Sequence, residues 1–177
     1  NTFMGNKITY KHKELTCPEH YEVVGDFSSA SFLIVAGLIS KSGKLKIKNV
    51  GLNPSRSLLI KILQSMGGQI TISNERKISN EEVGDLNVSP SKLKGFDHLN
   101  FSSEVRPEDI IPNIIDEIPI LSIAAAFAEG STILNGLEEL TIKESNRLAA
   151  ICDGFDAIGI NYFSDRKSSI KLYGNYN

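Results

Sequence analysis

Some segments of the chain place apolar residues with the period of a helix, and others alternate apolar and polar residues as a strand does. The order of these segments occurs twice along the chain. Ala30 to Ile39 is an apolar run of helix length, and Lys44 to Val50 alternates lysine with apolar residues as a half-buried strand does. Arg56 to Met66 then carries apolar residues at helical spacing. Short strands are expected around these elements, at Tyr21–Val24, Gln69–Ser73 and Asp85–Val88.

The second half of the chain repeats this order after about Leu99. Ile114 to Ala128 predicts a helix, Ser131 to Leu137 a strand, and Lys143 to Ile158 a second helix. Two short strands are expected to follow, at Ile160–Phe163 and Ser169–Leu172.

The repeated order predicts an internal duplication of a β-α-β-α-β-β unit, which places the chain in the α/β class. The polar loops at 74–84 and 89–95 are short, so both units are expected within one domain. We predict an incomplete N-terminal segment over 1–20, a first unit over 21–94 and a second unit over 95–177.

Composition and charge narrow the function classes. The formal net charge is -2, which gives no support to a nucleic-acid or membrane partner, and the longest apolar runs are shorter than a membrane span. Cys17 and Cys152 lack metal-ligand spacing, so reduced thiols in a cytoplasmic protein are expected. The chain begins with Asn1 instead of Met, from which we expect a partial chain.

Three segments carry candidate chemistry. In order and spacing they resemble the 5-enolpyruvylshikimate-3-phosphate synthase family, over nearly the whole chain from about residue 21 onward. The segments are Gly25–Phe32 with Asn49–Arg56, Ile115–Ile120 running into Ala124–Gly130, and Glu138–Arg147.

The resemblance implies a fold and a reaction. The family has two domains, each made of three β-α-β-α-β-β units around buried helices, and this chain would hold two units of one domain. The family reaction joins phosphoenolpyruvate to the 5-hydroxyl of shikimate 3-phosphate and expels phosphate, without a metal or an organic cofactor.

The resemblance also assigns roles to four residues. Asp116 matches the general acid/base aspartate near the reacting hydroxyl, and Lys143 matches the lysine that contacts shikimate 3-phosphate. Glu144 matches a glutamate that is the second candidate for moving protons at the enolpyruvyl methylene. Arg147 matches an arginine that holds phosphoenolpyruvate.

The residue types suit this chemistry. Both substrates are anions, for which arginine offers a planar fork and lysine a compact charge. Lys143 and Arg147 are spaced i, i+4, so a helix would place them on one face near its positive end. Asn146 stands where the family usually has Asp, and Thr141 where it has Arg, so the orientation of Arg147 is in question.

Simpler interpretations exist for the same residues. Asp116 and Glu117 also fit acidic residues in a first helical turn, and the group from Lys143 to Arg147 also fits a solvated helix face. Asp26 with Ser28 and Ser29 predicts a helix N-cap outside the site, and Arg56 a surface residue after a turn.

Two hypotheses follow for the chain as a whole, with a third less favoured. It is an enzyme segment whose missing domain lies on another chain or was removed, or it is a non-catalytic remnant that at most binds anions. The third is the related transferase acting on UDP-N-acetylglucosamine, which the Asp116 and Lys143 segments match less well.

Overall fold

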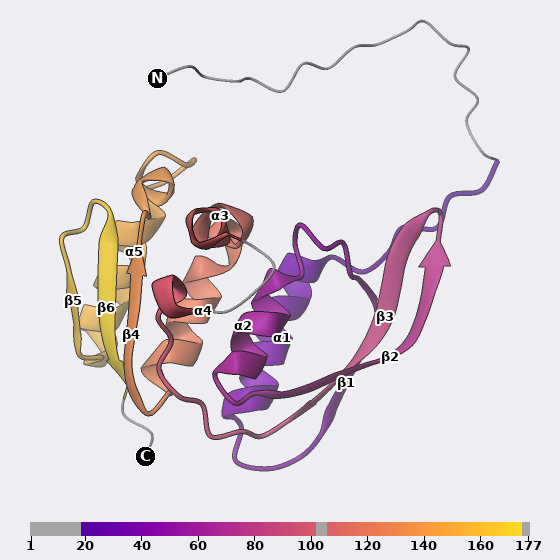
Figure 1. The fold of residues 1–177 in the computed structure, drawn as a ribbon, viewed down its shortest axis with the longest axis horizontal. Helices are drawn as coiled ribbons and strands as arrows, with labels where there is room; N and C mark the ends of the chain where they lie inside the picture. Colours follow the sequence, from indigo (N-terminus) through magenta and orange to yellow (C-terminus); the bar gives the residue numbers. More distant parts are fainter. Residues whose placement is uncertain (1–18, 102–105, 175–177) are drawn as a thin grey trace, which may run out of the picture.

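The computed structural model describes residues 19–101 and 106–174. Helices lie between two sheets that occupy opposite flanks of the molecule (Figure 1), so the predicted α/β class is confirmed. The predicted N-terminal segment 1–20 lies almost entirely outside the described residues, as does Cys17. The elements are, in chain order, α1 (Phe27–Ile39), β1 (Leu45–Gly51), α2 (Leu58–Ser65), β2 (Gln69–Ile78), β3 (Glu81–Ser89), η1 (His98–Asn100), α3 (Pro107–Asn113), η2 (Ile115–Glu117), α4 (Ile118–Ala126), β4 (Gly130–Asn135), η3 (Glu138–Thr141), α5 (Arg147–Ile158), β5 (Tyr162–Ser164) and β6 (Ser169–Gly174).

Each half of the described chain contributes one three-stranded antiparallel sheet. The strand orders are β1-β3-β2 and β4-β6-β5, so the last strand of each half lies between the other two. This shared order agrees with a duplicated unit. The division of the chain between residues 94 and 95 stays a prediction.

The core forms where α1 packs against α4 and both helices pack on the sheets. Both helices carry apolar residues on nearly every side, which is typical of helices in a protein interior. Ile34, Leu38 and Leu121 are completely buried. Burial of such a side chain stabilises the fold by about 1.5–3 kcal/mol.

The strand predicted at Tyr21–Val24 is wrong. Its four residues belong to no strand, and the isolated parallel bridge next to them joins Gly25 to Val50. Tyr21 and Val23 are exposed, so no apolar face holds this segment on the sheet.

The polar loop predicted at 74–84 is also wrong, because most of it belongs to a long hairpin. β2 continues to Ile78 and β3 begins at Glu81. Ser79 and Asn80 have φ angles of 48° and 69°, as a two-residue type I′ turn requires. The polar residues here are held by the backbone ladder, which a hydrophobic pattern does not reveal.

The helix predicted over Ile114–Ala128 is shorter than expected, covering Ile118–Ala126. α3 ends at Asn113, the 3₁₀ turn η2 follows, and α4 begins at Ile118. Pro119 lies in the first turn of α4, where a missing N–H costs nothing. The break gives Asp116 a place in a turn instead of on a continuous helix.

A buried carboxylate stabilises two bulges in the first sheet. Asp85 of β3 accepts hydrogen bonds from the backbone N–H of Asn49 (3.1 Å) and from Asn74 Nδ2 (3.5 Å), and it pairs with Lys46 Nζ at 3.2 Å. Asn49 and Asn74 both have positive φ, where the registers of β1 and β2 shift against β3. The hydrogen bond from Asn49, supported by Lys46, lowers the pKa of Asp85 despite its burial.

Gly95 supports a testable prediction about the junction between the halves. A Cβ at Gly95 would lie 2.1 Å from the carbonyl oxygen of Ser131, so Gly95→Ala forces the backbone apart. We expect Gly95→Ala to lower the free energy of unfolding by about 2–3 kcal/mol, measured by urea denaturation.

Gly154 of α5 is the matched control, because a Cβ there meets nothing within 4 Å. Gly154→Ala should raise stability by about 0.5–1 kcal/mol. Equal effects of the two changes would contradict the close approach.

Candidate functional site

Asp116 occupies the middle of η2, between α3 and α4. Ile114 and Ile115 on its N-terminal side are buried and anchor the turn in the core. The Asp116 side chain remains 49% exposed. A carboxylate on a well-anchored turn is therefore open to solvent.

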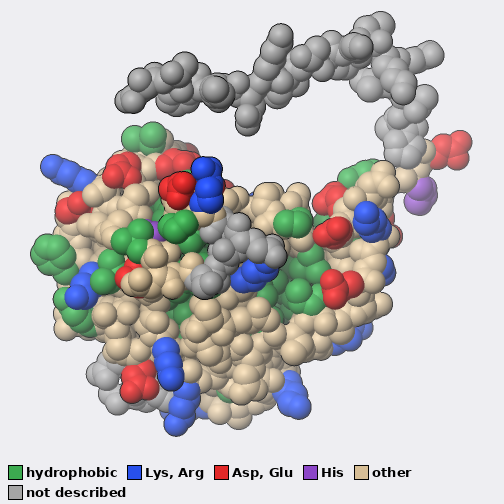
Figure 2. All heavy atoms as spheres, viewed as in Figure 1, with side chains coloured by type: hydrophobic (Ala, Val, Ile, Leu, Met, Phe, Trp, Pro, Cys, Tyr) green, Lys and Arg blue, Asp and Glu red, His purple; other side chains and the backbone are tan. Residues whose placement is uncertain are grey.

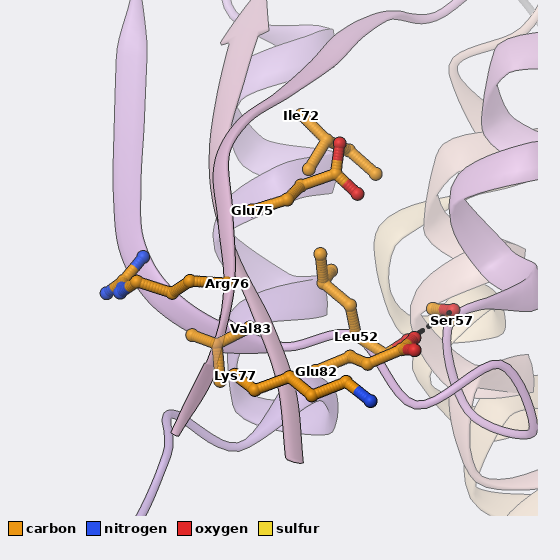
Figure 3. Close-up of a pocket in the computed structure, with 8 residues that line it drawn as sticks. All are labelled: Leu52, Ser57, Ile72, Glu75, Arg76, Lys77, Glu82 and Val83. Atoms are coloured by element: carbon orange, nitrogen blue, oxygen red, sulfur yellow. Dashed lines mark hydrogen bonds between the residues drawn. The ribbon is translucent and has the colours of Figure 1, made fainter. Parts of the chain in front are cut away.

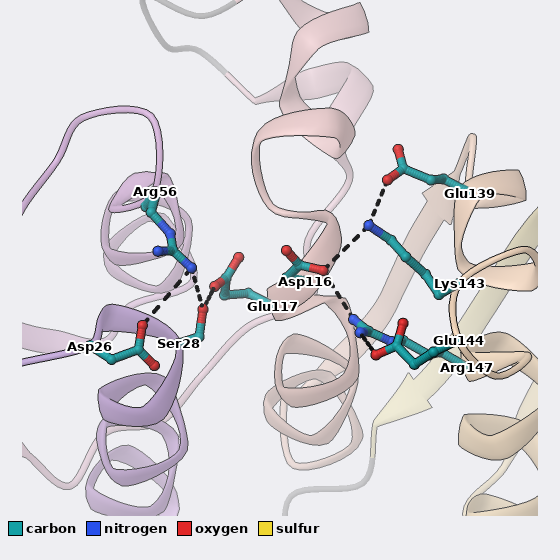
Figure 4. A network of polar contacts seen from close by, with 9 residues as sticks. All are labelled: Asp26, Ser28, Arg56, Asp116, Glu117, Glu139, Lys143, Glu144 and Arg147. Atoms are coloured by element: carbon teal, nitrogen blue, oxygen red, sulfur yellow. Dashed lines mark hydrogen bonds and ion pairs between the residues drawn. The ribbon is translucent and has the colours of Figure 1, made fainter.

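Lys143 and Arg147 converge on one oxygen of Asp116. Lys143 Nζ lies 3.6 Å from Asp116 Oδ1, and Arg147 Nη1 donates a hydrogen bond to the same atom at 3.0 Å (Figure 4). The cations are 24% and 27% exposed, less than the carboxylate. The structure thus brings together three of the four residues singled out from the sequence, and the fourth, Glu144, contacts Arg147.

Two further carboxylates pair with the cations. Glu144 Oε1 accepts from Arg147 Nη2 at 2.5 Å, and Glu139 Oε1 lies 2.7 Å from Lys143 Nζ. Sequence reasoning missed Glu139, although its i, i+4 spacing to Lys143 was a usable signal. An incoming anion must displace these carboxylates or share the cations with them.

The pairing shifts the pKa values in the expected directions. The hydrogen bond from Arg147 lowers the pKa of Glu144, so Glu144 is a carboxylate at neutral pH. The hydrogen bond to Glu139, followed by the charge of Asp116, raises the pKa of Lys143. The contact with Glu144 raises the pKa of Arg147. Both cations stay charged in the physiological range.

The predicted helix over Lys143–Ile158 begins later than expected. α5 starts at Arg147, and Asn146 caps it by accepting a hydrogen bond from the Ala149 N–H at 2.9 Å. Lys143 and Glu144 precede the helix, so the i, i+4 helical argument for Lys143 and Arg147 is wrong. Their side chains meet at Asp116 from two places, Lys143 from the connection between η3 and α5, and Arg147 from the first residue of α5. Asn146 performs the capping role that starts the helix at Arg147.

A second polar group lies on the other side of η2. Asp26 accepts hydrogen bonds from Ser29 N and Oγ, both at 2.8 Å, so the predicted N-cap is confirmed. These hydrogen bonds lower the pKa of Asp26. Glu117 is buried and accepts from Ser28 Oγ at 2.6 Å, and Arg56 Nη2 donates to the same hydroxyl at 3.3 Å (Figure 4). Arg56 is half exposed, in agreement with the surface position predicted for it, but it is not isolated.

Several hollows mark the surface of the described residues, among them two with apolar side chains in their lining. One, of about 550 Å³, is an apolar groove bounded by Arg147, with Phe32 of α1, Ile123 of α4 and Ile158 of α5 among its lining residues. The other, of about 400 Å³, lies beside the β2–β3 hairpin, where apolar side chains reach the surface (Figures 2 and 3). Its charged lining has both signs and contains no residue of the Asp116 cluster, so of these two hollows the first adjoins that cluster.

None of the described helices combines the length and apolar character that crossing a bilayer requires. Within residues 19–101 and 106–174, no group of three or more His, Cys, Asp or Glu side chains is arranged to hold a metal ion.

Comparisons with known proteins agree on one family. The family model described as EPSP synthase (3-phosphoshikimate 1-carboxyvinyltransferase) matches residues 4–168. The chain is 49% identical over 144 residues to the 3-phosphoshikimate 1-carboxyvinyltransferase of Zymomonas mobilis, covering 81% of this chain and 30% of that protein. It is 45% identical over 166 residues to that of Leptospira interrogans, covering 89% and 36%.

A solved structure shows the same fold. The EPSP synthase of Acinetobacter baumannii superposes with a TM-score of 0.76 at 38% identity, over 86% of this chain and 32% of that chain. The chain therefore spans about a third of the length of the relatives it matches.

The capping residue of α5 supports a second prediction. Asn146→Ala removes the acceptor for the Ala149 N–H and should lower the free energy of unfolding by about 1 kcal/mol. Asn146→Asp keeps the acceptor and adds a charge that the helix dipole favours, so its stability should equal or exceed that of the unaltered chain. Urea denaturation of both variants checks this pair. An unchanged midpoint for Asn146→Ala would show that the cap does not hold the helix start.

Proposed function

Because this chain belongs to the EPSP synthase family, we propose that it forms part of an enzyme that transfers the enolpyruvyl (carboxyvinyl) group of phosphoenolpyruvate to the 5-hydroxyl of shikimate 3-phosphate. This reaction belongs to the shikimate pathway of aromatic amino-acid biosynthesis, and a cytoplasmic location is part of the proposal. The observation that carries it is the shared contact of Lys143 and Arg147 with Asp116 Oδ1. The matching family model and the named relatives are all of the shikimate branch and not of the UDP-N-acetylglucosamine branch.

The cations support binding of two anionic substrates. Two phosphorylated molecules repel each other unless positive charge lies between them, and Lys143 and Arg147 supply it beside a half-exposed carboxylate. We assign shikimate 3-phosphate to Lys143 and phosphoenolpyruvate to Arg147. The planar fork of arginine fits phosphate or carboxylate, and the lysine ammonium acts as a point charge.

The carboxylates support the proton transfers. In the addition step the 5-hydroxyl oxygen bonds to C2 of phosphoenolpyruvate, the hydroxyl loses its proton, and the methylene carbon gains one. In the elimination step the new methyl group returns a proton and the C–O bond to phosphate breaks. Asp116 is assigned to the hydroxyl, whose proton it accepts, and Glu144 to the methylene carbon. When phosphoenolpyruvate occupies Arg147, Glu144 loses the hydrogen bond that lowers its pKa and can carry the proton that the methylene carbon gains and the methyl group returns. General acid/base help of this kind is worth about 100–10,000-fold.

The chain is proposed to work with other segments of the family protein. It spans about a third of its relatives, and two cations are few for two multiply charged substrates. The apolar groove beside Arg147 and the exposed Phe32 and Ile158 are surfaces that a further segment would cover. The segment is supplied by the same polypeptide or by another chain. The non-catalytic alternative rests on the same short coverage.

Phosphate release is the third prediction and separates these alternatives. The chain alone, mixed with phosphoenolpyruvate and shikimate 3-phosphate, should release no phosphate, because the remaining cations and the closing surface are supplied elsewhere. Joined to the remaining portion of a full-length relative, it should release phosphate only with both substrates present. Turnover by the chain alone would refute its incompleteness. An inactive joined protein that still binds shikimate 3-phosphate would favour the non-catalytic remnant.

Substitutions in that joined protein give the fourth prediction. Asp116→Asn should lower kcat by about 100–10,000-fold with little change in substrate affinity, because it removes a proton acceptor and keeps the shape. Arg147→Ala should weaken phosphoenolpyruvate binding by roughly 10–100-fold, through loss of a charge-assisted hydrogen bond.

Arg106 provides the matched control, since its exposed guanidinium pairs with Glu108 and Asp109 away from the site. Arg106→Ala should leave both constants unchanged. An unaltered rate for Asp116→Asn, measured by phosphate release, would show that the acid/base assignment is wrong.

A further inference from the structure

Two consecutive carboxylates of η2 point in opposite directions. Asp116 faces Lys143 and Arg147 in the second half of the chain, whereas Glu117 faces Ser28 and Arg56 in the first half (Figure 4). The turn is therefore held from both sides, by residues that lie far apart in sequence.

The Glu117 side of the turn is the enclosed side. Glu117 is 4% exposed, and its Oε1 accepts a 2.6 Å hydrogen bond from Ser28 Oγ across the interface between α1 and η2. Arg56 donates to the same hydroxyl and lies 3.9 Å from Asp26, so a cation faces the buried carboxylate through one hydroxyl group. A buried carboxylate with such partners has a defined position.

The position of the Asp116 side chain is less firmly fixed by its own contacts than that of Glu117. Its partners are two long side chains, each of which also pairs with another carboxylate, and Asp116 itself is half exposed. Exposed ion pairs of this kind fix a side chain poorly. Within the turn, the Glu117 N–H bonds to the Ile114 carbonyl at 2.9 Å, so the backbone that carries Asp116 moves together with Glu117.

We propose that Glu117 and Ser28 are positioning residues for Asp116, and that their hydrogen bond makes the orientation of the site carboxylate depend on the first half of the chain. The inference rests on the proposed function only in taking Asp116 as a substrate-facing group. Its geometric content concerns the contact between Asp116 and Arg147 and needs no substrate.

Nuclear magnetic resonance of the arginine guanidinium groups tests this content in the full chain. With ¹⁵N-labelled arginine, the Nη signals of Arg147 report its contact with Asp116, and Asp116→Asn supplies the reference for a lost contact. The main variant is Ser28→Ala with Glu117→Leu, which removes donor and acceptor together and so leaves no buried polar group without a partner. Ser28→Ala alone is the second variant, judged by the same signals where the double variant fails to fold.

The expected result is that the Arg147 signals of both variants move toward those of Asp116→Asn while the thermal transition stays cooperative. Glu117→Gln keeps an acceptor for Ser28 and should leave the signals unchanged. Ser29→Ala is the matched control on the same helical turn, because its hydroxyl bonds only to Asp26 in the structure. Folded Ser28 variants with unaltered Arg147 signals would overturn the proposal, as would an equal displacement in Ser29→Ala.

A titration with shikimate 3-phosphate separates this inference from the proposed function. Where the unaltered chain binds it, the double variant should bind roughly tenfold more weakly or worse, because small displacements of positioned groups are costly. Where the unaltered chain does not bind it, substrate recognition by this chain fails, and the arginine signals still decide the positioning role.

Discussion

The packing of α1 against α4 is the interaction on which the rest of this structure depends. Both helices are apolar on nearly every side, so neither is stable in water without the other and the sheets that cover them. This contact brings the start of α1 beside η2, where α4 begins. The polar groups around Asp116 and Glu117 are thus placed by hydrophobic packing beneath them and add little to the stability of the fold.

The charges around Asp116 make better sense as a binding arrangement than as a source of stability. Pairs between half-exposed side chains contribute at most about 1 kcal/mol each. Here three carboxylates (Asp116, Glu139 and Glu144) surround two cations, and the cations are the less exposed members of the pairs with Asp116 and Glu144. Cations held in this way can exchange a carboxylate for another anion without rearrangement of the backbone. An apolar groove adjoins Arg147, so the charged cluster borders a hydrophobic hollow of the surface.

Part of the fold and of the candidate site could be predicted from the sequence. The features that could not be predicted have a common physical cause. Apolar periodicity located α1, β1 and α4, and the resemblance to the family singled out Asp116, Lys143, Glu144 and Arg147. Apolar periodicity failed where polar hydrogen bonds decide: the β2–β3 hairpin is held by its ladder, and the Asn146 cap starts α5 at Arg147. The contact of Ser28 with Glu117 joins residues 89 positions apart, and no local signal marks it.

The opposed carboxylates of η2 also limit how the chain length can vary. In a 3₁₀ turn successive side chains are about 120° apart, so one inserted or deleted residue rotates the following ones to a different side. A deletion ahead of Asp116 would offer the longer Glu117 to the cations, and an insertion would direct Asp116 into the enclosed site beside Ser28. A substitution changes one side chain and leaves the others in place. A change of length by one residue would move every side chain of the turn relative to the packed helix. The segment between α3 and α4 is therefore a place where homologous chains should differ in composition and agree in length.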